Sequence, residues 1–347
     1  MWGYLNNSAV GVKVSFVVAV YNVSDYVEQC VRSLYEQTLQ DIEIVLVDDC
    51  TPDDSIAIAL RALEDYPQRK EQVRVVHHDI NKDLPQTRWD GILAATGEYI
   101  ILIDGDDYVD VRMAEMLYDK AVEKDADMVV CDHWLCTPQG NRVRKMAPDG
   151  AIGDGDNIRR DIINLNVPVN VWCKMVRRSV YMDNDIVWPV KGYAEDVVVS
   201  TVTAYYARRI ACVDEPLYFY RYNPNSYSRG MDEPTRMRQF EAYKANWQIL
   251  YQFMVREGLL EKYEVGVFKG KMRLKKHLLP LVSKRKYRRL YFATCPEVDR
   301  AFFWGTPHRT PSYRERVWVV AIWLGLYPML KRRLYSKRFR PRKEWLS

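Results

Sequence analysis

The stretch Tyr99–Asp107, which reads YIILIDGDD, gives the clearest indication of the fold of this 347-residue chain. Its first five residues are apolar or aromatic, which is typical of a strand covered on both faces of a sheet. Three carboxylates follow within four residues, those of Asp104, Asp106 and Asp107. Neighbouring carboxylates repel one another unless a cation lies between them, and hard oxygen ligands suit Mg²⁺ or Mn²⁺. A solvated acidic turn is the alternative, but directly after a buried strand the metal interpretation is favoured.

The sequence on both sides of this stretch alternates apolar runs with segments of helical periodicity. Strands are expected at residues 14–20, 42–47, 73–77, 99–103 and 128–131, and helices at 26–37, 56–66, 84–95 and 111–124. Such alternation predicts βαβ units and an α/β fold with a mainly parallel central sheet.

The pattern changes towards the C-terminus. It loosens between residues 134 and 190, and then predicts a helix at 195–207 and strands at 210–213 and 217–222. Beyond Pro234 almost all of the pattern is helical, over 240–257, 261–282 and 314–334. We therefore predict an α/β catalytic domain over residues 1–230 and a helical extension over residues 231–347.

Polar residues follow the expected strands where each strand ends. In an open parallel sheet, ligands bind at the carboxyl ends of the strands. The residues at these positions are Tyr21, Asn22, Asp48, Asp49, Asn81, Lys82 and the acidic turn. No GxGxxG or GxxxxGK[ST] motif is present, so neither a dinucleotide fingerprint nor a P-loop is indicated.

Four motifs in order resemble the family 2 glycosyltransferases of bacterial polysaccharide synthesis, which have the GT-A fold. They are VSFVVAVYN, EIVLVDD, NKxLxxxRxxG and AxGEYIILIDGDD, and the resemblance covers about residues 12–230. It implies an inverting transfer of a sugar from a nucleotide sugar to a hydroxyl of a glycan or lipid-linked glycan. Two positions depart from the usual pattern: Cys50 replaces a glycine or asparagine, and Asp83 stands where glycine is common.

The resemblance also implies roles for single residues at the nucleotide. Tyr21 would stack on the base, Asp49 would accept a hydrogen bond from uracil N3–H, and Arg88 would pair with the diphosphate. Asp104 and Asp106 resemble the DxD motif, with Asp106 on Mn²⁺ or Mg²⁺, Asp104 towards the ribose, and Asp107 in support. The implied nucleotide-binding set is Tyr21, Asp49, Lys82, Arg88, Asp104 and Asp106, of which Asp104 and Asp106 also form the metal site.

The pair Glu195–Asp196 is the expected catalytic centre. Inversion needs a base on the face opposite the leaving diphosphate, and the resemblance assigns this role to Asp196, with Glu195 orienting it or binding the acceptor. Acids that complement a helix dipole are the alternative.

Weaker candidates are Trp172 and Lys174 for the donor-sugar or acceptor pocket. A loop with Arg221, Ser226 and Ser228 is a candidate for binding the diphosphate. For both sets of residues, a purely structural role fits the sequence equally well.

The charge of the chain is unevenly distributed. Residues 271–347 carry 21 lysines and arginines against 4 acidic residues, whereas residues 1–270 carry 30 against 42. The apolar run Val317–Leu330 is too short to span a bilayer, and cations flank it. We therefore predict peripheral binding to the anionic inner face of the cytoplasmic membrane. A helix buried on the body, or on a second subunit in an oligomer, is the alternative.

The cysteine content and the N-terminal sequence indicate the cellular compartment, and two alternative functions are compared with the glycosyltransferase interpretation. Seven scattered cysteines without a CxxC motif predict a reduced, cytoplasmic protein, and the N-terminus does not resemble a secretory signal. His77 and His78 are expected to be structural. One rival is a nucleotidyltransferase that acts on sugar phosphates. The other is a non-enzymatic protein that binds nucleic acid through the basic tail. The latter lacks a reader motif and leaves the acidic motifs unexplained, so no nucleic-acid partner is expected.

Overall fold

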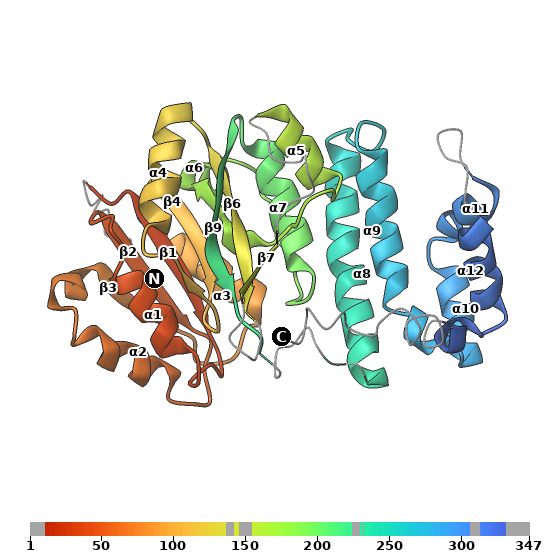
Figure 1. Ribbon diagram of the computed structural model, residues 1–347, viewed down its shortest axis with the longest axis horizontal. Helices are drawn as coiled ribbons and strands as arrows, with labels where there is room; N and C mark the ends of the chain where they lie inside the picture. The colour runs from red at the N-terminus through yellow and green to blue at the C-terminus, as the bar shows by residue number, and fades with distance from the viewer. Residues whose placement is uncertain are drawn as a thin grey trace.

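A single mixed sheet with helices on both faces forms the N-terminal part of the molecule, and α8–α12 extend from one side of it (Figure 1). The computed structural model describes residues 11–136, 142–145, 155–223, 230, 232–305 and 313–330. The strand order is β3-β2-β1-β4-β8-β6-β9-β5, and β7 pairs with β6. The predicted α/β class is confirmed.

The first half of the sheet is parallel. Its strands are β1 (Val14–Val20), β2 (Ile42–Asp48), β3 (Val73–His77) and β4 (Tyr99–Asp104). β1 lies at the centre, between β2 and β4, and it pairs in parallel with both. Helices cover both faces of β1, β2 and β4, so these three strands are buried at nearly every position, whereas the edge strand β3 is only partly buried. The four strands therefore lie where the apolar runs predict them.

The second half of the sheet contains strands that the sequence pattern does not show. They are β5 (Tyr108–Val109), β7 (Arg142–Lys145) and β8 (Lys174–Arg177), and β8 runs antiparallel between β4 and β6 (Met128–Cys136). The two strands expected between residues 210 and 222 form one strand, β9 (Ile210–Tyr220). The β6–β9 register shifts near Asp132, which pairs with Pro216, so the strand continues through the proline that reads as a break.

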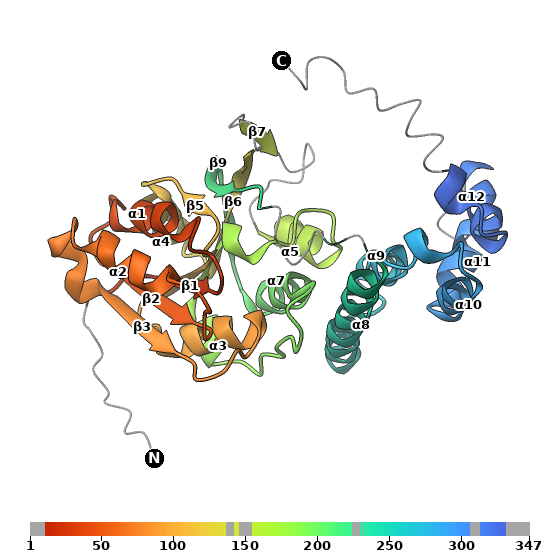
Figure 2. The same cartoon turned by 90° about the horizontal axis from the view of Figure 1, so that it is seen from below.

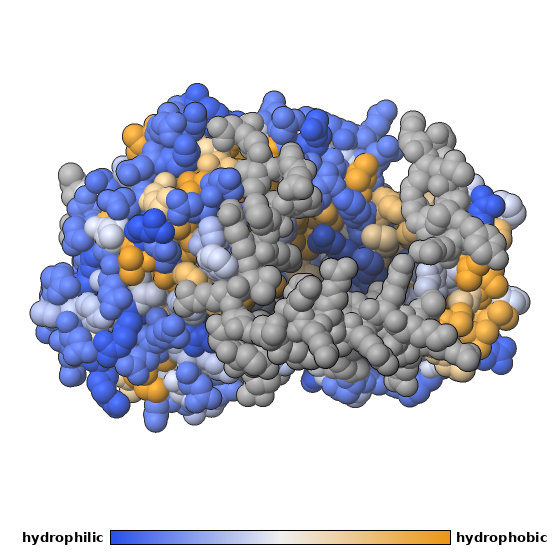
Figure 3. Space-filling view, viewed as in Figure 1, coloured by the Kyte–Doolittle hydropathy of each residue, from blue (hydrophilic) through white to orange (hydrophobic). Residues whose placement is uncertain are grey.

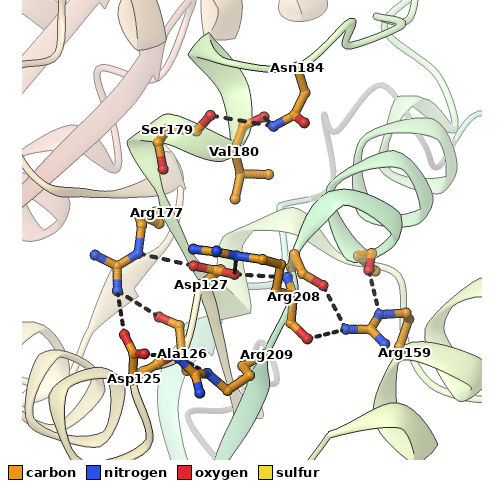
Figure 4. A network of polar contacts seen from close by, with 12 residues as sticks. Asp125, Ala126, Asp127, Arg159, Arg177, Ser179, Val180, Asn184, Arg208 and Arg209 are labelled. Atoms are coloured by element: carbon orange, nitrogen blue, oxygen red, sulfur yellow. Dashed lines mark hydrogen bonds and ion pairs between the residues drawn. The ribbon is translucent and has the colours of Figure 1, made fainter.

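A network of ion pairs fastens the start of β6 to its neighbours (Figure 4). Asp127 accepts hydrogen bonds from Arg177 Nε at 3.2 Å and from the Arg208 backbone N–H at 2.8 Å. Arg159 donates to the backbone carbonyls of Ala204, Ala207 and Arg208. These contacts hold the ends of β6, β8 and α7 together at the end of the sheet away from the acidic turn.

Two apolar cores lie on the two faces of the sheet. One face is covered by α1 (Val27–Tyr35), α2 (Ser55–Leu63) and α4 (Met113–Lys124). The other is covered by α3 (Leu84–Ala94), α5 (Asp156–Ile163), α6 (Arg178–Met182) and α7 (Glu195–Tyr206). Gly91 lets α3 approach closely, because a Cβ there would lie 2.3 Å from Val17 Cγ1.

The helices after residue 230 begin by extending the second core. α8 (Glu233–Arg256) and α9 (Glu264–Lys276) contribute Phe240, Trp247 and Leu274 to the same cluster as the sheet. α9 is shorter than the helix predicted over 261–282, because it ends before Pro280 and the 3₁₀ turn Leu279–Leu281. Other 3₁₀ turns lie at Pro67–Gln72 and Val171–Cys173.

Three further helices, α10 (Arg285–Ala293), α11 (Pro296–Trp304) and α12 (Tyr313–Trp323), lie beyond α8 and α9 on the side away from the sheet (Figure 2). Lys275 on α9 fastens them, donating to Asp299 Oδ2 at 2.6 Å and to the Tyr291 carbonyl at 2.7 Å. Within the described ranges, no helix has the length and apolar character needed to cross a membrane. The cations expected from Lys331 onwards lie outside the described residues.

Candidate active site

A cavity of about 500 Å³ lies where β1, β2 and β4 end. It brings together the polar residues that the sequence analysis placed at the ends of separate strands. Its lining includes Tyr21, Asn22, Asp49, Asn81, Asp83, Thr87, Asp104, Asp106 and Asn223. The size and the converging polar groups suit a ligand of nucleotide dimensions.

Asp49 is held in place by its neighbours. It accepts a hydrogen bond from the Lys82 backbone N–H at 2.7 Å, and its Oδ1 lies 2.8 Å from Nδ1 of the buried His78. A structural or surface role was expected for His78, and the particular partner, Asp49, was not predicted. The signal was its position, directly after the end of β3. The Lys82 ammonium points to Asp90 at 3.1 Å and does not line the cavity, so it is the backbone of Lys82 that contributes to the site.

Arg88 lies behind the cavity as the hub of a carboxylate network. Its side chain is 2 % exposed and does not line the cavity. Its Nη2 donates to Asp104 Oδ1 at 2.6 Å, and its Nη1 donates to Glu195 Oε1 at 2.8 Å and Asp196 Oδ1 at 3.3 Å. The guanidinium predicted to face a diphosphate is thus occupied with three carboxylates from β4 and α7.

Burial changes the acidity of these groups. Desolvation raises the pKa of Glu195, and the charge of Asp196 raises it further, while the Arg88 charge opposes both. Desolvation also raises the pKa of Asp196 against the same opposing charge. A carboxylate with a raised pKa holds a proton more strongly than an exposed one does.

The acidic turn after β4 presents two carboxylates and buries the third. Asp104 and Asp106 both line the cavity, and Asp106 accepts a hydrogen bond from Asn223 Nδ2 at 2.9 Å. Asp107 instead accepts from the Tyr218 hydroxyl and the Arg221 backbone N–H, both at 2.7 Å. Among the described residues, no group of three or more acidic, histidine or cysteine side chains is arranged around a metal site. Two carboxylates fit an ion whose shell is completed by substrate phosphates.

A second cavity of about 250 Å³ adjoins the first and contains the pair on α7. Asp104 and Asp106 line both cavities, and Glu195 and Asp196 line the second. Trp172 is also in its wall and stacks on Tyr218, with ring centroids 4.1 Å apart. The structure thus brings together the two acidic motifs that lie far apart in the sequence.

Two of the weaker candidates differ in their surroundings. Arg221 lines the second cavity, between the rings of Tyr26 and Tyr108, and donates to Gln29 Oε1 at 2.8 Å. Lys174, expected in the pocket, is buried behind it and donates to the Asn170 carbonyl, because β8 directs its side chain into the protein. Ser226 and Ser228 lie outside the described residues.

The two departures from the family pattern share a backbone feature. Cys50 has φ = 55° and Asp83 has φ = 71°, and positive φ values are adopted most easily by glycine. Asp83 makes use of its side chain there: Oδ2 accepts a hydrogen bond from the Gly192 N–H at 3.0 Å. That contact ties the start of α3 to the loop before Glu195.

Comparison with known proteins agrees with this geometry. The profile of the family described as "Glycosyl transferase family 2" matches residues 15–184. The uncharacterised glycosyltransferase EpsJ of Bacillus subtilis is 35% identical over 247 residues, which are 66% of this chain and 68% of that protein. A poly(ribitol-phosphate) β-glucosyltransferase of Bacillus spizizenii is 31% identical over 212 residues, which are 60% of this chain and 32% of that protein.

Solved structures resemble the chain over nearly its whole length. Residues 1–349 of TarS from S. aureus, in complex with UDP-GlcNAc, superpose with a TM-score of 0.56 at 18% identity, covering 94% of this chain and 92% of that one. The mannosyltransferase PcManGT of Pyrobaculum calidifontis, in complex with GDP-Man and Mn²⁺, gives 0.53 at 14% identity, covering 95% and 89%. At these identities the likeness shows the fold.

Replacing Arg88 by methionine should strongly destabilise the protein, by about 3–5 kcal/mol, because the buried Glu195 and the partly buried Asp104 and Asp196 lose their counter-charge. Adding Glu195→Gln to that variant should restore part of the loss, since it removes one of the unpaired charges. Urea unfolding followed by circular dichroism of the single and double variants measures both effects. Arg112→Met, which breaks an exposed pair with Asp110, is the control and should change stability little. Equal stability of Arg88→Met and Arg112→Met would show that the network does not hold the site together.

Proposed function

The chain belongs to glycosyltransferase family 2, and we propose that it moves a sugar from a UDP-sugar to a hydroxyl of a glycan or lipid-linked glycan, with inversion and with a divalent cation. The observation that carries the proposal is the shared cavity: Asp104 and Asp106 face Glu195 and Asp196 across one space of about 250 Å³. The setting is the synthesis of cell-surface polysaccharide.

Relatives support the choice of donor and acceptor class. TarS is solved with UDP-GlcNAc, and PcManGT is solved with GDP-Man and Mn²⁺. The Bacillus spizizenii relative is named for glucosyl transfer to poly(ribitol-phosphate), a cell-surface type of acceptor. In this chain the cavity wall formed by Tyr21 and Asp49 combines an aromatic face with a fixed hydrogen-bond acceptor, which suits a uracil base.

The chemistry assigned to α7 is a single displacement. The acceptor hydroxyl oxygen forms a bond to the anomeric carbon while the bond from that carbon to the diphosphate oxygen breaks. The hydroxyl proton goes to Asp196, and the diphosphate leaves with the bonding electron pair. Burial raises the pKa of Asp196, so its carboxylate is a stronger base than an exposed one. Glu195 and Arg88 orient Asp196.

The acidic turn is assigned to the cation and the nucleotide. Asp106 would hold Mn²⁺ or Mg²⁺ together with Asp104, and a bound ion would stabilise negative charge on the leaving diphosphate. Asn223 holds Asp106, and Asp107 fastens the turn to β9, so both carboxylates stay directed at the cavity. Arg88 limits the repulsion between Asp104 and the acids of α7. We therefore assign to Arg88 the neutralisation of these carboxylates.

Metal removal tests the role of the turn. Asp106→Ala should abolish release of nucleoside diphosphate from UDP-sugars, and EDTA should do so reversibly in the wild type, because the leaving group would lose its stabilising charge. Asp119→Ala, an exposed acid on α4, is the control and should remain active. Full activity after dialysis against EDTA would contradict the metal role, and release of pyrophosphate would instead identify a nucleotidyltransferase.

The base is tested separately from nucleotide binding. Asp196→Asn should lose about 10²–10⁴ in turnover, the usual contribution of a positioned base, while UDP affinity stays close to that of the wild type. Calorimetric titration with UDP and a coupled assay measure the two quantities. Asp183→Asn, an exposed acid on the preceding loop, is the matched control. Normal turnover by Asp196→Asn would assign the base elsewhere, with Glu195 the next candidate.

The helical region that we place after residue 230 is proposed to bind an anionic membrane surface. The segment around α12 exposes large apolar side chains, with Trp323 66% and Met329 69% exposed, and Val317, Val320, Leu324 and Leu326 are also exposed. Figure 3 shows hydrophobic residues gathered at the end of the molecule formed by α10–α12. An apolar surface next to a strongly basic segment is typical of interfacial binding on the inner face of the cytoplasmic membrane.

Removing the two most exposed apolar side chains of the segment around α12 should weaken this binding. The double variant Trp323→Ser/Met329→Ser should sediment with anionic vesicles less than the wild type, and most clearly at high salt, because salt screens the lysines and arginines but not the apolar contact. Leu60→Ser/Val122→Ser, at exposed positions of the catalytic region, should sediment like the wild type. If neither wild type nor variants bind vesicles, and the wild type alone forms dimers by size-exclusion chromatography, the apolar surface is a subunit interface instead.

A further inference from the structure

A third cavity, of about 330 Å³, opens on the far side of Asp196 from the nucleotide cavity. It lies between the N-terminal end of α7 and the C-terminal end of α9. Both ends lie towards the lower side of Figure 1, where β9 also ends. Its lining residues are Val169, Tyr193, Ala194, Asp196, Val197, Tyr243, Arg273, Lys276 and His277. No residue of this cavity lines the nucleotide cavity.

Asp196 is the link between this third cavity and the second one. Tyr193, Ala194 and Asp196 line both, whereas Asp104 and Asp106 line only the first and second. The three cavities therefore form a series, with the nucleotide at one end and the carboxylate of Asp196 between the second and third. An acceptor that presents its hydroxyl to Asp196 opposite the leaving diphosphate would occupy the third cavity.

The charge of the third cavity is mainly positive. α9 contributes the guanidinium of Arg273 and the ammonium of Lys276, and the only carboxylate in the lining is that of Asp196. Lys271 and Lys275, on the same helix, are compensated by Glu297 at 2.8 Å and Asp299 at 2.6 Å. Arg273 makes no hydrogen bond or ion pair within the part of the chain that the structure describes. Arg273 therefore differs from Lys271 and Lys275, which join α9 to α11.

The walls add aromatic faces and a buried hydroxyl. The His277 ring lies between Tyr193 and Tyr243, with ring centroids 5.3 Å and 5.4 Å away. Burial and the charge of Arg236 lower the pKa of His277 to about 4, so its ring is neutral at pH 7. The Tyr243 side chain is 4 % exposed, and among the described residues its hydroxyl has no hydrogen-bond partner. A polar ligand in the cavity would satisfy that hydroxyl.

We propose that this cavity binds a phosphate group of the acceptor, held by Arg273 and Lys276, with the adjoining part of the acceptor packed against Tyr193 and His277. The proposal rests on the proposed function, because it takes Asp196 as the base. A guanidinium and an ammonium on one wall match the charge and hydrogen-bond needs of phosphate. The phosphate can come from the phosphodiester of a polymer or from the head of a lipid carrier, and both place it beside a sugar or polyol.

Titration of the full-length protein with inorganic phosphate, after saturation with UDP and Mg²⁺, tests the site. The double variant Arg273→Ala/Lys276→Ala should bind phosphate at least tenfold more weakly than the wild type, and Lys276→Glu should do the same. Lys271→Ala, which removes a charge from the same helix outside the cavity, should bind like the wild type. UDP affinity should be equal in all four proteins, and a thermal melt checks their folding. Glycerol phosphate and farnesyl phosphate are then compared, and the tighter binder identifies the source of the phosphate.

Phosphate affinity equal in wild type and in both cavity variants, with UDP binding intact, would overturn the proposal. An equal loss of phosphate affinity in Lys271→Ala would also overturn it, because the loss would then depend only on the net charge of α9. If UDP does not bind the wild type, the proposed function fails instead. The comparison of cavity variants with Lys271→Ala, run without nucleotide, still decides whether phosphate binds at α9.

Discussion

The structure of the site depends on one buried guanidinium. The positive charge of Arg88 on α3 is buried, and three carboxylates compensate it. They are those of Asp104, at the end of β4, and of Glu195 and Asp196, at the start of α7. Without that charge, the carboxylates of the two motifs would repel one another across the cavity that they share. The close packing of α3 on the sheet at Gly91 and the bond from Gly192 to Asp83 keep Arg88 at this position.

Local patterns predicted much of this arrangement. The parallel strands β1, β2 and β4 are buried on both faces, so their apolar runs are visible in the sequence, and polar residues at their ends mark the cavity. The acidic turn was found for the same reason. What could not be predicted was which long-range partner each charged side chain takes. An arginine that neutralises three carboxylates has the same sequence signature as one that binds a diphosphate, and the role of His78 depends on Asp49 lying on the neighbouring strand. The antiparallel strand β8 is short and begins with the buried Lys174, so it shows no hydrophobic periodicity from which a strand could be predicted.

The roles of single charged residues in the C-terminal region could not be predicted either. A count of lysines and arginines predicts a basic surface, but it does not show which side chains form ion pairs within the protein and which line a cavity. In the structure, Lys275 is buried in an ion pair, Lys271 pairs with an exposed acid, and Arg273 and Lys276 face a cavity beside Asp196. One helix thus divides its cations between holding the fold together and lining a space next to the predicted base. The aromatic residues of α8 and the loop before α7 complete that space.

The ion pair between Lys275 and Asp299 has a geometric consequence. It joins α9, which forms a wall of the third cavity, to α11, which packs against α12 and its exposed apolar side chains. The two surfaces are therefore connected through α9 and α11. If α12 lies on a bilayer, Asp196 is held at a constant height above the lipid headgroups. Such an enzyme would select acceptors by reach as well as by chemistry: a sugar carried too close to the membrane, or too far from it, would not arrive at the carboxylate.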